Sequence, residues 1–243
     1  MCFNTKSKIV IKYSWLLRFP SVYAWLSSKR CSVNYEKLLY LRSIQKGDVI
    51  FDIGANIGYY SLLFSKLCGK NGFVHSFEPV PETYQLLVRT MENCKNAKAN
   101  NLAAGDSDET LNMSYDPEDC EKASLVVDST STSSTRSVKV LPLDTYAEKI
   151  KLEKLNFIKC DVEGFELKAL KGMKHTLAKH LPRLSIEITL DDETRKELVE
   201  LLMQLGYDSF YKIEKGFPAY DPKQDMKKQR DYFYLHATSS LAS

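Results

Sequence analysis

Short apolar runs alternate with amphipathic segments through much of the chain. The runs at 49–53 and 73–78 predict two buried strands, and each is followed by apolar positions at helical spacing. Gly69 marks the end of the first predicted helix, and Pro81 opens the second. Strand, helix, strand and helix in this order are typical of parallel β-α-β units.

The alternation is interrupted in the middle of the chain and then resumes. A third strand is expected over 98–103, and short strands at 111–115 and 138–143 flank a Ser/Thr-rich stretch at 124–137. We expect that stretch to form a mobile loop or a hairpin tip, because it cannot supply a core. The later elements are predicted as a strand at 157–161, a helix at 165–177, a strand at 184–189, a helix that begins near Asp191 or Asp192 and ends at Gly206, and strands at 209–213 and 232–236.

Length and composition favour one α/β domain with an attachment. With 243 residues, of which 44% are apolar, the chain can bury a substantial core. We place an N-terminal basic and aromatic helical extension at 1–32 and the main domain at 33–243. The 34 basic and 31 acidic residues nearly balance, so no nucleic-acid partner is expected. The six cysteines lack metal-ligand or disulfide spacing, which favours reduced thiols and a cytoplasmic location.

The N-terminal extension mixes aromatic and basic residues. Lys12, Arg18 and Pro20 interrupt its apolar positions, so a signal peptide is not expected. No window of the chain reaches the roughly 20 apolar residues of a membrane span. The segment at 8–30 is compatible with peripheral contact with an anionic membrane surface, or with a cover over a lipid-like substrate. A helix packed over the core or against a second copy is the alternative that we favour.

The turn after the first strand indicates the kind of ligand. In FDIGANIGYYS, residues 51–61, Asp52 lies at the strand end, and Gly54 and Gly58 follow in a DxGxxxG pattern. A dinucleotide site has the spacing GxGxxG, so that a pyrophosphate reaches the helix N-terminus. A carboxylate at the strand end would repel a pyrophosphate, but it accepts hydrogen bonds from an ammonium group or its ordered waters. The pattern therefore favours a ligand with an amine and disfavours an NAD-binding oxidoreductase.

An acidic residue at the end of the second strand indicates that this ligand also contains a ribose. Glu78 closes that strand in VHSFEP, where a carboxylate can accept both ribose hydroxyls of a nucleoside. Amine and ribose without phosphate describe S-adenosylmethionine. The glycine turn alone is equally compatible with close helix packing and no ligand, but together with Glu78 it favours the cofactor.

Five segments resemble one family. They are GDVIFDIGANIGYYS (47–61), VHSFEPVPETY (74–84), NLAAGDSDE (101–109), VLPLDTY (140–146) and FIKCDVEGFELKALKGM (157–173). In this order they resemble the FkbM-type methyltransferases, a branch of the class I S-adenosylmethionine-dependent enzymes. The resemblance implies an α/β, Rossmann-like fold with a seven-stranded, mostly parallel sheet and helices on both faces. It also implies an O-methyltransferase that acts on a hydroxyl of a small molecule or glycan, such as a sugar, a polyketide or a lipid-linked saccharide.

The resemblance also implies where the cofactor binds. The turn at 54–58 would pass under the methionine moiety, Glu78 would hold the ribose, and the segment 101–104 would border the adenine. The cofactor-binding residues expected on this basis are Asp52, Gly54, Ala55, Asn56, Gly58, Glu78, Pro79, Asn101, Ala103, Ala104 and Asp161.

Candidate catalytic residues gather around the strand at 157–161. Lys159 and Asp161 are two positions apart, so on a strand they project to the same side. We expect Asp161 to contact the cofactor or act as a general base, and Lys159 to orient it or lower its pKa. Glu163 and Glu187 are second candidates. A buried lysine–carboxylate network that only fixes the strand end is the structural alternative.

A metal site and a binding module without turnover are the alternatives to this function. Three carboxylates permit a magnesium or calcium ion, but no histidine ligand lies beside them, and no metal is expected. A methyltransferase-like module that binds without turnover, recruited to a membrane or partner through its N-terminal segment, is the alternative function. The sequence does not specify the acceptor, which variable loops normally determine, or the oligomeric state.

Overall fold

A seven-stranded sheet forms the centre of the computed structural model, which describes residues 34–115, 134–188, 192–221 and 231–236. The first five strands in the spatial order run parallel, and only the sixth is antiparallel to its neighbours. This confirms the expected mostly parallel sheet. In spatial order the strands are β3 (Ala97–Asn100), β2 (Phe73–Phe77), β1 (Val49–Ile53), β7 (Phe157–Cys160), β8 (Arg183–Ile188), β10 (Asp231–His236) and β9 (Ser209–Lys212).

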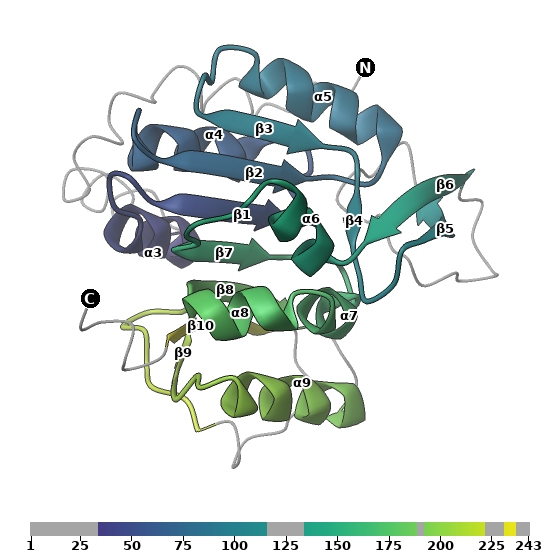
Figure 1. Cartoon of the computed structure of the whole chain (residues 1–243). Coiled ribbons are helices and arrows are strands. Elements are labelled where there is room, and N and C mark those ends of the chain that lie inside the picture. Colours follow the sequence, from purple (N-terminus) through teal and green to yellow (C-terminus); the bar gives the residue numbers. More distant parts are fainter. Residues whose placement is uncertain (1–33, 116–133, 189–191, 222–230, 237–243) are drawn as a thin grey trace.

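Helices cover both faces of this sheet, as Figure 1 shows. Residues of α3 and α4 pack with β1, β2 and β7 in one apolar cluster, and residues of α6 to α9 pack with the other face in a second, larger one. The helices are α3 (Tyr35–Ser43), α4 (Tyr59–Cys68), α5 (Pro81–Met91), α6 (Leu143–Lys149), α7 (Glu166–Lys171), α8 (Lys174–His180) and α9 (Asp192–Gln204).

The helix boundaries follow local chemistry. The residue before α4 is Gly58, at a φ of 88°, and the residue after it is Gly69, at a φ of 66°. Both lie in the region that glycine reaches without strain. Pro81 occupies the first turn of α5, where its missing N–H costs nothing. The predicted stop at Gly69 and start at Pro81 are confirmed.

The predicted third strand is only partly right. The chain leaves the central sheet after Asn100, and β4 (Ala103–Ala104) pairs instead with β6 (Ser134–Leu141) in a second, three-stranded sheet. The strand β5 (Glu109–Tyr115) pairs antiparallel with β6 and completes that sheet. The end of the Ser/Thr-rich stretch, predicted as loop, therefore belongs to β6, while 116–133 lie outside the described residues.

The predicted single helix at 165–177 is wrong, because it is two helices. The break lies at Gly172 and Met173, between α7 and α8. A Cβ atom at Gly172 would lie 1.7 Å from the carbonyl oxygen of Gly105. The break therefore occurs where the backbone before β5 passes directly against the helix, a contact that helical periodicity does not reveal.

The N-terminal extension lies wholly outside the described residues, which begin at Asn34. The boundary between 1–32 and 33–243 therefore remains a prediction. Among the described helices, none combines the length and the apolar character needed to cross a membrane.

Candidate active site

The glycine turn joins β1 to α4 at the carboxyl end of the central strands. Gly54 and Gly58 both have positive φ values, of 76° and 88°. A Cβ at Gly54 would lie 1.8 Å from the carbonyl oxygen of Asp161, and one at Gly58 would lie 2.8 Å from Cδ1 of Leu87. The chain itself therefore favours glycine at both positions, at Gly54 because a Cβ would clash with backbone and at Gly58 because of its positive φ. The case for a bound cofactor therefore depends on the side chains around the turn.

Glu78 follows β2 and holds the neighbouring backbone. Its Oε2 accepts a hydrogen bond from the amide of Asn56 at 2.9 Å, and its Oε1 accepts one from the amide of Val80 at 3.0 Å. Burial raises the pKa of this carboxyl to about 7, although both hydrogen bonds oppose the shift. Each carboxylate oxygen retains a second lone pair, so the group can still accept two hydroxyl donors. That capacity fits the expected ribose.

The residues expected near the adenine divide into two kinds. Asn101 donates from Nδ2 to the carbonyl oxygens of Glu78 and of Pro79, at 2.9 and 2.8 Å. It thereby fixes the backbone at Glu78 and Pro79. Ala103 and Ala104 are buried at 4% and 3% exposure and pack in apolar clusters, so their side chains are covered by protein.

The expected residues Ala55 and Asn56 complete the turn. The Ala55 side chain is buried against Leu87 and Met91 of α5. Asn56, at a φ of 49°, accepts a hydrogen bond from the amide of Ile57 with its Oδ1 at 2.6 Å. These residues shape the backbone of the turn, and the amide of Asn56 links it to the Glu78 carboxylate.

Asp52 lies on β1 below the turn and is fully buried. Its Oδ2 accepts a hydrogen bond from the hydroxyl of Ser61 at 2.5 Å. Within the described residues, its Oδ1 is a buried oxygen without a hydrogen-bond partner. Burial raises the pKa of this carboxyl, while Lys159 and Ser61 act in the opposite direction. An enclosed acceptor in this position fits an ordered water, but a fully buried Asp52 offers no exposed surface for the expected direct contact with an ammonium group.

Lys159 and Asp161 form an ion pair on the other side of β1. The Lys159 side chain is 4% exposed, and its Nζ lies 2.8 Å from Oδ2 of Asp161. Asp52 is the register partner of Lys159 on the neighbouring strand. Burial opposes the charge of Lys159, but the carboxylates of Asp161 and Asp52 outweigh it and raise the pKa of the ammonium group. Lys159 is therefore a buried cation that orients Asp161.

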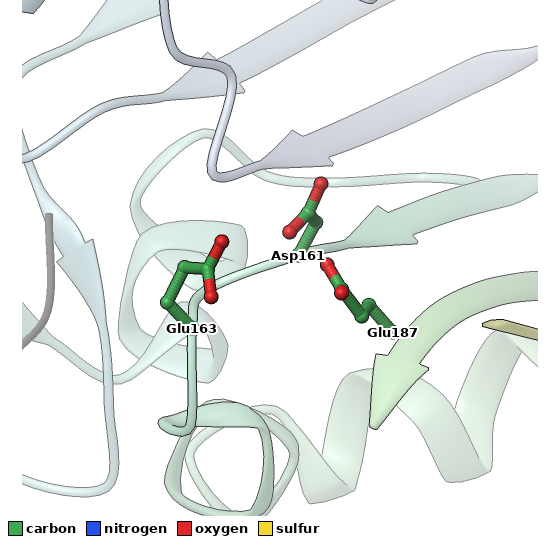
Figure 2. Close-up of side chains that lie close together, drawn as sticks. All are labelled: Asp161, Glu163 and Glu187. Carbon is green, nitrogen blue, oxygen red and sulfur yellow. The ribbon is translucent and has the colours of Figure 1, made fainter. Parts of the chain in front are cut away.

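Two further carboxylates lie beside Asp161. Glu163 follows β7 and Glu187 lies on β8, its neighbour in the sheet. Figure 2 shows the three side chains gathered where these strands end. One oxygen from each lies within 4.8 Å of the others, and Glu187 is buried. Three oxygen donors at this spacing could coordinate a hard cation, but acidic groups also gather without one. All four candidate catalytic residues are thus neighbours.

Several residues at the site carry no distinguishing signal in the sequence. Tyr60 belongs to the apolar pattern of α4 and Ser61 is an ordinary polar position beside it, yet Ser61 binds Asp52 and the ring of Tyr60 lies 5.4 Å from Nζ of Lys159. Glu36 lies on α3 and accepts a hydrogen bond from Tyr60. Only the approach of separate elements brings these groups together.

Comparison with known sequences identifies the family. Residues 52–209 match the model of the methyltransferase FkbM domain. The chain is also 32% identical over 139 residues to the hexuronic acid methyltransferase AglP of Haloferax volcanii. That match covers 57% of this chain and 55% of the relative, so the chain matches about half the length of this curated protein.

Comparison with solved structures identifies the fold. Fibrillarin of Aeropyrum pernix, in complex with S-adenosyl-L-methionine, aligns at a TM-score of 0.50 and 11% identity, over 89% of this chain and 73% of the other. A methyltransferase FkbM of Methylobacillus flagellatus aligns at a TM-score of 0.49 and 16% identity, over 94% and 60%. The first is similar to this chain in fold alone. Because the family model spans more than half of the sequence, the chain belongs to the FkbM methyltransferase family.

Proposed function

We propose that the protein is an S-adenosylmethionine-dependent O-methyltransferase acting on a hydroxyl of a sugar or glycan. The observation that carries this proposal is the placement of two carboxylates on opposite sides of the glycine turn. The strand order sets Glu78 beyond β2, and Asp161 beyond β7, with β1 between them. A ribose at Glu78 and a methionine moiety over the turn would bring the transferable methyl group toward Asp161.

S-adenosylmethionine supplies the methyl group. The chain has to bind this donor, hold the acceptor hydroxyl in line with the reacting bond and share its proton. Asp161 serves as the general base or as a direct contact to the donor, and Lys159 orients it through their 2.8 Å ion pair. Orientation of the reacting groups can account for about 7–11 kcal/mol of a barrier. A base contributes about 10²–10⁴-fold. Glu163 and Glu187 are the neighbouring candidates for the base.

The proposed acceptor class is inferred from the curated relative AglP. AglP is named a hexuronic acid methyltransferase, and a sugar hydroxyl is the acceptor proposed here. Suitable probes are p-nitrophenyl glucuronide and p-nitrophenyl glucoside, incubated with donor labelled in the methyl group. Label in either glycoside supports transfer to a sugar hydroxyl, whereas label in neither, from protein that binds the donor, rejects these two acceptors.

The first test is calorimetric titration of the full chain with S-adenosylmethionine, S-adenosylhomocysteine and NAD. Binding of the first two without NAD establishes the donor site. Failure of folded protein to bind either would reject the enzyme and favour the alternative, a methyltransferase-like module without turnover. Glu78→Ala is the matched variant, and unchanged affinity there would remove Glu78 from the site.

The enzyme is proposed to be cytoplasmic, and peripheral membrane contact through residues 8–30 is the alternative to a segment packed on the protein itself. The support is the mixture of basic and aromatic residues in this segment. Co-sedimentation of the full chain with anionic and neutral vesicles tests the contact. Binding to anionic vesicles that salt abolishes supports it, and no binding to either favours a segment packed on the protein itself.

A further inference from the structure

Helix α3 brings the carboxylate of Glu36 toward Lys159 from outside the family-matched segment 52–209. Glu36 accepts two tyrosine hydroxyls, that of Tyr40 at 2.5 Å on Oε1 and that of Tyr60 at 2.6 Å on Oε2. Tyr40 lies on α3 and Tyr60 on α4, and the Tyr40 hydroxyl also lies 3.0 Å from Oγ of Ser185 on β8. Glu36 therefore joins two helices at the face that covers β7.

The hydrogen bond to Glu36 fixes the ring of Tyr60. This ring packs edge-on against Tyr40 at 5.0 Å between centroids and stacks against Phe64 at 6.0 Å. With its hydroxyl held by Glu36, the ring cannot turn away from its neighbours. The Nζ of Lys159 lies 5.4 Å from the centre of the same ring. Tyr60 thus contributes a cation–π contact to the buried ammonium group.

Lys159 connects the fixed Tyr60 ring to Asp161. Its ammonium donates to Asp161, and the carboxylates of Asp161, Asp52 and Glu36 together raise its pKa against the effect of burial. An ammonium group covered by an aromatic face keeps its direction, because water cannot compete for its donors. If the Tyr60 ring moved, water would reach Lys159 and the orientation of Asp161 would loosen.

We propose that Glu36 is a positioning residue for the methionine end of the donor, acting through Tyr60 and Lys159 on Asp161. This inference rests on the proposed function. With the ribose at Glu78, the amino-acid part of the donor lies on the Asp161 side of β1. Recognition of that part should depend on Glu36, and recognition of the adenine and ribose should not.

The experiment compares two ligands by calorimetry on the full chain. S-adenosylmethionine carries the amino-acid end, whereas 5′-methylthioadenosine carries adenine, ribose and a methylthio group without it. The variants are Tyr60→Phe, Glu36→Ala and Glu36→Gln. The glutamine amide can accept from one tyrosine and donate to the other, so it conserves the arrangement without the charge. Tyr207→Phe is the matched control, because its hydroxyl donates to the carbonyl of Pro182, which precedes β8 at the end of that strand opposite Glu187.

We expect Tyr60→Phe and Glu36→Ala to weaken S-adenosylmethionine binding about fivefold, with 5′-methylthioadenosine unchanged. Glu36→Gln should remain near wild type, and Tyr207→Phe should change neither affinity. Equal losses for both ligands, no loss, or the same loss in Tyr207→Phe would overturn the inference and leave the proposed function standing. Wild-type protein that binds neither ligand would instead overturn the proposed function, and the inference with it.

Discussion

The charge of Glu78 should control donor affinity through pH. Burial raises the pKa of this carboxyl to about 7 from an ordinary 4.5, so the group is partly protonated near neutrality. Ribose hydroxyls donate hydrogen bonds, and a charged carboxylate accepts them more strongly than a protonated one. Binding should therefore select the ionised form and release a proton.

The magnitude follows from that pKa. If only the ionised form binds, the apparent Kd is multiplied by one plus the ratio of protonated to ionised carboxyl. This factor is about 1.1 at pH 8 and about 11 at pH 6, so affinity should fall about tenfold over this range. The Glu78→Gln variant has no titrating carboxyl at this position, so its donor affinity should lack this pH dependence. Loss of the charge-assisted hydrogen bonds should also weaken its binding near pH 8 by about tenfold.

The same shift predicts how folding stability depends on pH. The folded-state pKa lies above the unfolded value, so protonated Glu78 contributes stability below about pH 4.5, and that contribution is lost as the pH rises through 7. A difference of about 2.5 pH units corresponds to about 3 kcal/mol. Relative to Glu78→Gln, the ligand-free wild type should lose about this much unfolding free energy between pH 4.5 and 8.

Calorimetry in buffers of different ionisation enthalpy measures the protons released on binding. The donor's own amine titrates near neutrality, and the Glu78→Gln variant corrects for it. Wild type should release about half a proton more than the variant at pH 7. Identical proton release and identical pH dependence in the two proteins would show that Glu78 does not titrate on binding, and that its charge does not control donor affinity. Denaturant unfolding over the same pH range tests the stability difference independently.

Three further predictions concern the other side of the turn. Gly54→Ala places a Cβ against the Asp161 carbonyl and should lower the melting temperature and abolish donor binding; a stable variant that binds normally would contradict the packing. Asp161→Asn should fold but lose about 10²–10⁴-fold in methyl transfer, and near-normal turnover would exclude a required base there. EDTA should leave donor affinity and transfer unchanged, because Lys159 already neutralises Asp161; loss of transfer that magnesium restores would place a cation among the carboxylates.

The central sheet was predictable because its signals are local. Buried strands in parallel β-α-β units carry mostly apolar runs, and β1 and β2 show them, interrupted by Asp52 in β1 and by His75 and Ser76 in β2. Glu78 lies one residue beyond β2, so its position at the carboxyl end of the sheet followed once that strand was recognised. The pairing of Lys159 with Asp161 followed from the period of two along a strand.

Other elements depended on contacts between distant segments. Apolar character alone does not distinguish the two sheets, so the departure of Ala103 and Ala104 to pair with β6 was not foreseen. The break between α7 and α8 likewise depends on the backbone of Gly105 passing against Gly172. Such contacts are set by the packing of whole elements, and the helical periodicity of the sequence does not reveal them.

By itself the sequence determined the strand–turn–helix that begins at β1, the acidic residue after β2 and the family, because each depends on residues close together in the chain or on motifs in a fixed order. The close contact that demands glycine at Gly54, and the link from Glu36 through Tyr60 to Lys159, depend on the tertiary structure. Those residues come from α3, α4 and β7, and the free energy that brings them together is that of burying the apolar faces of both helices on the sheet.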